Sequence, residues 1–161
     1  MMQATIIYKG PIEGKVKGLG AEVKASLQQQ LVTWHQTYLD PHFDTLAKVQ
    51  SRYPNVYRPR GKDYMIRKAN KYGHQNTLEF SGQTRREVSR SISVSGTSKQ
   101  ARGRMSGANR GLNWSGRSNM PDMRSEILAW NPDEIDALAT QHGERIAKFL
   151  EDKTETETVR I

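Results

Sequence analysis

Residues 78–96 read LEFSGQTRREVSRSISVSG, and the second half of this stretch sets the fold class. Val88, Ile92 and Val94 fall on one side of an extended chain, whereas serines alternate with them on the other side. This period of two is typical of a β-strand with a serine-rich solvent face. We therefore predict a strand over residues 88–95, in a chain whose other periodic segments are mostly helical.

A second strand and a long helix are predicted upstream. Residues 3–8, QATIIY, are rich in β-branched side chains and precede Lys-Gly-Pro, which indicates a strand that ends at a turn. From about residue 20, apolar side chains recur at steps of three or four, as in an amphipathic helix. They are Val23, Leu27, Leu31, Trp34 and Tyr38. We interpret the aromatic members of this stripe, together with Tyr53, as core rather than as a stacking platform.

The stretch after this stripe predicts a further helix. Asp40 and Pro41 fit the N-cap and the first position of a helix. We expect two helices, or one helix kinked at Pro41, ending before Pro54. Residues 54–77 lack a sustained period, so we expect a loop there, with at most a helical turn near residues 63–70.

The following region is expected to form an extended hairpin. Residues 96–121 contain five glycines and five basic residues without a single acid, which predicts a mobile basic loop. Residues 123–130, MRSEILAW, can then return as a strand. This strand would pair with the one predicted over residues 88–95.

The last helix is indicated by its N-terminal cap. Asn131 is a good N-cap, Pro132 suits the first helical position, and Glu134 follows three residues after the cap, as in a capping box. The expected buried stripe consists of Ile135, Leu138, Ala139, His142, Ile146, Phe149 and Leu150. Residues 151–161 are polar and are expected to form a flexible tail.

These elements together predict a single α+β domain over residues 1–150. Its fold class is an antiparallel β-sheet with an extended hairpin, packed by a long N-terminal helix and a C-terminal helix.

The composition argues against several classes of protein. The chain of 161 residues has no cysteine, which excludes disulfide scaffolds, Cys-ligated zinc and thiol catalysis. No apolar run approaches the roughly 20 residues of a membrane span, and no signal peptide is recognised, so we expect a soluble protein. The four histidines form no metal motif, and neither paired carboxylates nor a hydrolase triad is indicated. We therefore expect no cofactor, no metal and no enzymatic activity.

Charge is distributed unevenly along the chain. The net charge of +8 is the sum of +1 over residues 1–50, +12 over residues 51–117 and −5 over residues 118–161. This asymmetry suggests an anionic partner for the middle of the chain, or head-to-tail contact between copies. A simpler interpretation, which stays open, is a solvent-exposed surface with an uneven distribution of charge. Leu, Ile, Val and Phe make up only 30 of the 161 residues, so a thin core is expected, which partner subunits can complete.

Two classes of function remain open for the basic region. In one, its arginines neutralise phosphates of a nucleic acid while Trp114 or Tyr72 stacks on a base. In the other, the basic loop is an arm that becomes ordered against neighbouring subunits. The candidate residues for a subunit interface or a DNA-facing lumen are Lys99, Arg102, Arg104, Arg110, Trp114 and Arg117.

A family resemblance favours the second class. Residues 71–73, KYG, and 78–85, LEFSGQTR, lead into the predicted strand and resemble a region of tailed-bacteriophage head–tail joining and tail-completion (neck) proteins that introduces a β-hairpin. Residues 121–128, PDMRSEIL, and 131–135, NPDEI, are similar to that family's last strand and C-terminal helix. A long early helix also belongs to the family plan. The chain departs from the pattern at Thr84, where the family often has Leu, and in its longer basic loop.

The resemblance implies a structural virion protein, a neck or tail-completion subunit that forms a homo-oligomeric ring joining the DNA-filled head to the tail. The implied partners are portal or adaptor proteins and tail-tube or tail-terminator proteins, with packaged DNA as a further contact and no membrane. The implied location is the neck or tail of the virion, assembled in the host cytoplasm. Adaptor, tail-terminator and tail-completion positions all fit.

Within such a ring, we expect the basic arm over residues 96–117 to meet an acidic surface, either residues 133–157 of a neighbour or an adjoining ring. Alternatively, part of the basic surface lines a lumen through which DNA passes. The alternative function is a basic nucleic-acid-binding protein that uses the same 96–117 loop.

Overall fold

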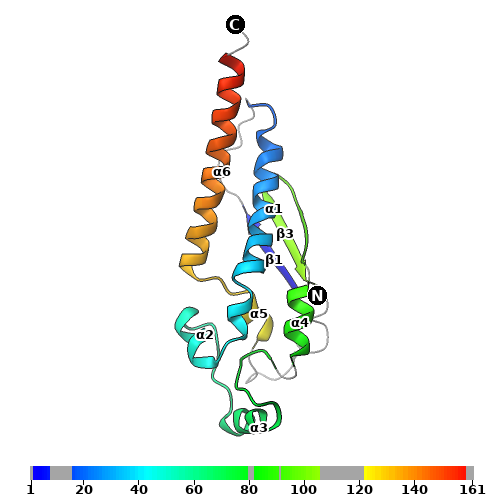
Figure 1. Ribbon diagram of the computed structural model, residues 1–161, viewed down its shortest axis with the longest axis vertical. Helices are drawn as coiled ribbons and strands as arrows, with labels where there is room; N and C mark the ends of the chain where they lie inside the picture. Colours follow the sequence, from blue (N-terminus) through cyan, green and yellow to red (C-terminus); the bar gives the residue numbers. More distant parts are fainter. Residues whose placement is uncertain (1, 8–15, 80–81, 91, 106–121, 159–161) are drawn as a thin grey trace.

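Helix α1 (Leu19–Thr37) is the central element of the fold, because it packs on a β-sheet and also on helix α6 (Pro132–Thr158). The structure is a computed structural model that describes residues 2–7, 16–79, 82–90, 92–105 and 122–158. Figure 1 shows an elongated molecule in which α6 runs beside α1, with the strands on the other side of α1. The sheet, α1 and α6 are therefore three successive layers.

The sheet has three antiparallel strands in the order β1-β3-β2. They are β1 (Met2–Ile7), β2 (Ile92–Gly96) and β3 (Gln100–Met105), so the central strand is the last one in the sequence. A Cβ atom on Gly103 of β3 would lie 2.6 Å from Ile92 Cδ1 and 3.6 Å from Leu31 Cδ1 of α1. Glycine at this position therefore leaves room for the Ile92 side chain of the neighbouring strand.

The mixed α+β class is confirmed, as are the N-terminal strand and the long helix. Four members of the predicted stripe are buried, namely Val23, Leu27, Leu31 and Trp34, whereas Tyr38 is half-buried. Tyr53 is also buried, which supports the interpretation of these aromatic residues as core. None of the helices in the described ranges is long and apolar enough to cross a membrane.

The segment after α1 forms two separate helical pieces. Asp40–Phe43 is a short 3-10 helix, η1, and α2 (Leu46–Arg52) follows it and ends before Pro54, as predicted. The next stretch contains a complete helix, α3 (Lys62–Tyr72), where only a helical turn was expected. Gly73 ends α3 in the left-handed conformation with φ +73°, which glycine adopts without strain.

The strand predicted over residues 88–95 is correct only from Ile92 onward. Residues Gln83–Arg90 form helix α4 instead, in which Gln83 Nε2 donates to Glu87 Oε1 across one turn at 2.7 Å. The Arg85 guanidinium holds this helix against Asp40 of η1, with nitrogen–oxygen distances of 2.6 and 2.9 Å. Val88 thus reaches the core from a helix. These contacts favour a helix over residues 83–90, although the alternating sequence pattern favours a strand from Val88 onward. The predicted strand forms only in β2.

The hairpin prediction is wrong in its second strand. β2 turns directly into β3, and the backbone N–H of Thr97 donates to the carbonyl oxygen of Gln100 at 2.7 Å. Part of the region expected to be a mobile loop over residues 96–121 is therefore the central strand. The expected return strand over residues 123–130 is instead a short helix, α5 (Met123–Ile127). Asp122 caps this helix by accepting from the backbone N–H groups of Arg124 and Ser125.

Helix α6 begins at the predicted capping box. Glu134 N–H donates to Asn131 Oδ1 at 2.8 Å, and Asn131 N–H donates to Glu134 Oε2 at 3.4 Å. Of the predicted stripe, Leu138 is buried, whereas Ile135 and Ala139 are exposed and the rest are half-buried. The helix continues to Thr158, so residues 151–158 are helical where a flexible tail was expected.

Candidate interaction surface

The side of the sheet that points away from α1 forms an open surface, called here the outer face. Because side chains alternate along a strand, this surface is made of every second residue of the three strands. Its exposed members are Gln3, Thr5 and Ile7 of β1, Ser93 and Ser95 of β2, and Arg102 and Arg104 of β3. The outer face is therefore polar apart from Ile7 at one end.

Two arginines occupy the middle of the outer face. Arg104 lies opposite Gln3 on one side and opposite Ser93 on the other. Arg102 lies in the same way between Thr5 and Ser95. Residues two apart on a strand are separated by about 7 Å, so the two guanidinium groups stand in adjacent rows, each flanked by uncharged hydrogen-bonding groups.

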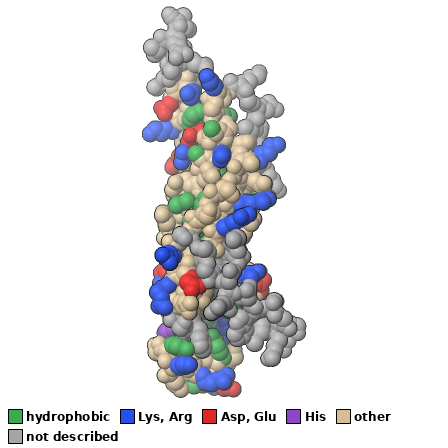
Figure 2. Space-filling model, turned by 90° about the vertical axis from the view of Figure 1, so that its right-hand side faces the viewer, with side chains coloured by type: hydrophobic (Ala, Val, Ile, Leu, Met, Phe, Trp, Pro, Cys, Tyr) green, Lys and Arg blue, Asp and Glu red, His purple; other side chains and the backbone are tan. Residues whose placement is uncertain are grey.

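Among the described residues, no carboxylate pairs with the positive charge of the outer face. The three strands contain no Asp or Glu, and within the described residues no ion pair involves Arg102 or Arg104. Figure 2 views the molecule from the side that lies to the right in Figure 1, and Lys and Arg side chains are spread along it, with Asp and Glu side chains between some of them. The described part of the outer face therefore attracts an anion and offers no carboxylate of its own that would repel it.

The structure describes half of the predicted site residues. Arg102 and Arg104 lie together on the outer face, and Lys99 is exposed in the turn between β2 and β3. Arg110, Trp114 and Arg117 lie outside the described residues. Tyr72, the other proposed stacking residue, is at the end of α3 and its ring lies 6.3 Å from that of His74.

Sequence reasoning placed Arg102 and Arg104 in a loop and missed the polar groups of β1 beside them. A signal for the strand was present in residues 100–105, QARGRM, where Gln100 and the arginines alternate with Ala101, Gly103 and Met105. Ala101, Gly103 and Met105 are buried, whereas the two arginines are exposed. The glycine content of residues 96–121 concealed this short alternation.

A shallow pocket adjoins the outer face at the edge of β1. It is lined by Gln3, Ala4 and Thr5 together with Leu128 and Trp130. The Trp130 ring stacks on the buried Trp34 ring with centroids 5.4 Å apart, so the wall of this pocket is fixed to the core.

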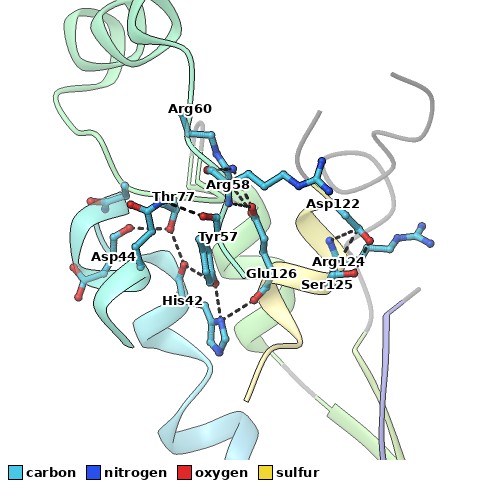
Figure 3. Close-up of polar contacts among 12 residues, drawn as sticks. His42, Asp44, Tyr57, Arg58, Arg60, Thr77, Asp122, Arg124, Ser125 and Glu126 are labelled. Carbon is cyan, nitrogen blue, oxygen red and sulfur yellow. Dashed lines mark hydrogen bonds and ion pairs between the residues drawn. The ribbon is translucent and has the colours of Figure 1, made fainter. Parts of the chain in front are cut away.

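A separate polar cluster is buried between α5 and the segment from η1 to α3 (Figure 3). Glu126 is 1% exposed and accepts hydrogen bonds from both terminal nitrogens of Arg60 and from the backbone N–H of Arg58. His42 Nδ1 lies 2.6 Å from the Tyr57 hydroxyl and 3.1 Å from the Glu126 carbonyl oxygen. These contacts tie α5 to residues far away in the sequence.

Burial controls the protonation of this cluster. It lowers the pKa of His42 to about 4, because the charged imidazolium is costly away from water. Burial likewise raises the pKa of the Tyr57 hydroxyl, with the negative charge of Glu126 adding to the effect. His42 is therefore neutral at pH 7. Because its ring and the Glu126 carboxylate are closed off from solvent, we interpret the cluster as a structural anchor.

Neither a metal site nor a comparison with known proteins assigns a function to the described residues. Among the described residues, no three His, Asp or Glu side chains lie close enough together to hold a metal ion. No protein-family model, no curated protein and no solved structure matches the chain.

Proposed function

We propose that the protein is a structural subunit of a tailed-phage neck, a head–tail joining or tail-completion protein that forms a homo-oligomeric ring. Its partners would be portal or adaptor proteins on one side and tail-tube or tail-terminator proteins on the other. The proposal draws on the family resemblance of residues 71–135. The long α1, the β2–β3 hairpin and the capped α6 agree with that plan, whereas α5 replaces the last strand.

The observation that carries the ring proposal is a pair of exposed apolar side chains near the start of α6, Ile135 and Ala139. Ile135 is 49% exposed and Ala139 is also exposed, although both belong to the stripe that the sequence predicts to be buried. Leu138, one turn from Ile135 on a neighbouring part of the same helix face, is buried, and its carbonyl oxygen accepts from Gln30 Nε2 of α1 at 2.8 Å. A second copy packed on the exposed side would remove Ile135 from water.

The two outer layers of the subunit differ chemically, so that one can face the lumen of a ring while the other stays away from it. The outer face of the sheet carries Arg102 and Arg104, whereas the start of α6, on the other side of α1, exposes Asp133 and Asp136. A head-to-tail contact joins two different surfaces and closes into a ring when the rotation between copies allows it. In such a ring the outer face of the sheet can point into the lumen, while other surfaces make the contacts between copies.

Light scattering of the purified chain over a range of concentrations tests the ring. We expect an oligomer larger than a dimer, and we expect Ile135→Asp to shift it toward the monomer while leaving the circular dichroism spectrum unchanged. Ile66→Asp is the matched control, because Ile66 on α3 is similarly exposed at 46%. A wild-type chain that stays monomeric at the highest concentration would refute the ring.

The position in the virion has a separate test. Genes for portal, capsid or tail-tube proteins beside the gene for this chain would support a neck protein. A neighbourhood without any phage structural gene would count against it.

Nucleic-acid binding is the second candidate function. The arginines of the outer face, which no described carboxylate pairs with, favour it and support a binding surface on the sheet rather than on a loop.

A further inference from the structure

We infer that the outer face of the sheet binds the phosphate backbone of nucleic acid without reading its sequence. The surface consists of Arg102 and Arg104 with the hydroxyl and amide groups that flank them. Identifying the nucleic acid as packaged DNA rests on the proposed neck function, whereas the phosphate-binding surface rests on the sheet alone.

The side-chain chemistry of the outer face matches phosphate. A guanidinium group donates parallel hydrogen bonds to two phosphate oxygens, and this pairing is stronger than a neutral hydrogen bond. Ser, Thr and Gln side chains are common additional donors to the backbone of nucleic acids. Both arginines have such donors as cross-strand neighbours. Arg104 lies between Gln3 and Ser93, and Arg102 lies between the hydroxyl groups of Thr5 and Ser95.

The spacing of the arginines also suits a dense line of charge. Arg102 and Arg104 are about 7 Å apart along β3. Double-stranded DNA carries about one negative charge for each 1.7 Å of its axis, so both guanidinium groups can lie over phosphates of the same duplex.

Nucleic acid fits the outer face better than an acidic helix of a second copy does. Protein interfaces depend on buried aromatic and aliphatic side chains at their centre. The centre of the outer face has only Arg, Ser, Thr and Gln, and Ile7 stands at its end opposite Gln100. A polar surface with a concentrated positive charge is instead typical of contacts with nucleic acid.

The same composition predicts binding that is independent of sequence. None of the three strands contains an aromatic residue, and the Trp130 ring beside β1 is already stacked on Trp34, so the described strands offer no ring for a base to stack on. Arg102 and Arg104 stand on the middle strand of a sheet with neighbours on both sides, rather than on a helix or a two-stranded ribbon that could enter the major groove. Affinity is therefore expected to come from phosphate contacts and to fall with salt.

Fluorescence anisotropy with two labelled DNA duplexes of equal length and unrelated sequence tests this inference on the full chain. The test variant is Arg102→Gln with Arg104→Gln. The control is Lys24→Gln with Lys148→Gln, which removes the same charge from exposed positions of α1 and α6. Light scattering of the same samples reports the oligomeric state.

The wild type is expected to bind both duplexes equally. The arginine variant is expected to bind at least tenfold more weakly, with the slope of log K against log salt reduced by about 2, while the control keeps most of its affinity. Equal losses in both variants would overturn the inference. So would a variant that loses its oligomer but keeps DNA binding, because the outer face would then be a subunit interface. A monomer with arginine-dependent DNA binding would refute the ring and still support this surface.

Discussion

Arg60 and Glu126 form a two-point ion pair inside the protein, with side-chain exposures of only 10% and 2%. The pair connects the segment before α3 to α5, and the Arg58 backbone N–H completes the hydrogen bonding of the carboxylate. A buried charge whose partner is removed is much more costly than a buried pair left intact. The stability of this end of the molecule therefore depends on both partners being present.

Arg60→Met is expected to lower the free energy of unfolding by about 3–5 kcal/mol, because it leaves the Glu126 carboxylate buried without a counter-charge. Urea unfolding followed by circular dichroism measures the loss. The matched control is Lys48→Met, which breaks the exposed pair of Lys48 and Asp44 and is expected to cost less than about 1 kcal/mol. Similar losses for both variants would show that the buried pair has no special role.

The stability of the protein is expected to fall in acid because of His42. Its pKa is about 4 in the folded protein, against about 6.5 in the unfolded chain. The unfolded state therefore takes up this proton first, and the stability present above pH 6.5 is lost as the pH falls toward 4. The difference corresponds to about 3 kcal/mol.

Unfolding free energies at pH 7 and pH 4.5 test this for the wild type and for His42→Gln. The variant is expected to lose less stability over that interval, whatever its stability at pH 7. Glu134, whose pKa burial raises, changes stability in the opposite direction, but it does so in both proteins. Parallel pH profiles would rule out a role for His42.

Asn131→Ala is expected to destabilise the protein by about 1 kcal/mol, since it removes the side-chain acceptor for the Glu134 N–H at the start of α6. Thermal unfolding measures the change, and Asn131→Ser should restore most of the stability because serine also caps helices. Asn70→Ala, at an exposed position of α3, is the control and should not destabilise. A loss in Asn131→Ser as large as that in the alanine variant would argue against capping.

Substitution of glycine by alanine is expected to change the free energy of unfolding in opposite directions at two positions. A Cβ atom on Gly96 would lie 2.7 Å from the Gln100 carbonyl oxygen and 3.0 Å from the Ala101 Cα, and backbone atoms cannot rotate away. Gly96→Ala should therefore destabilise by about 1–3 kcal/mol. Gly143 lies within α6 with nothing near its Cβ position, so Gly143→Ala should stabilise by up to about 1 kcal/mol. Both are measured by urea unfolding at one protein concentration, and the reverse order would contradict the β2–β3 geometry.

The sequence predicted the elements whose signals are local. The stripe of α1 and the capping box at Asn131 and Glu134 each lie within one helix, and both are present as predicted. Helix α4 was missed because Arg85 depends on Asp40, which lies 45 residues earlier and cannot be paired with it from a pattern. Helix α5 was missed although its cap, Asp122, is local. Residues 123–130, MRSEILAW, end in an apolar run that follows a predicted loop, and such a segment also suits a strand.

The candidate site was predicted in part. Arg102 and Arg104 were selected for their charge, which the sequence displays directly. Their arrangement was not predictable, because it depends on β3 lying between β1 and β2, and the pairing with Gln3 and Thr5 joins opposite parts of the chain.

The strand order also has a consequence for how the protein folds. Met2 is paired with Met105, so β1 has no partner until β3 has been synthesised. The β2–β3 hairpin joins neighbouring residues and can form quickly, whereas pairing between such distant segments slows folding. Until then the hydrogen-bonding groups of β1 are open to other chains, which favours aggregation. We therefore expect β1, which is synthesised before β2 and β3, to be the last of the three strands to join the sheet.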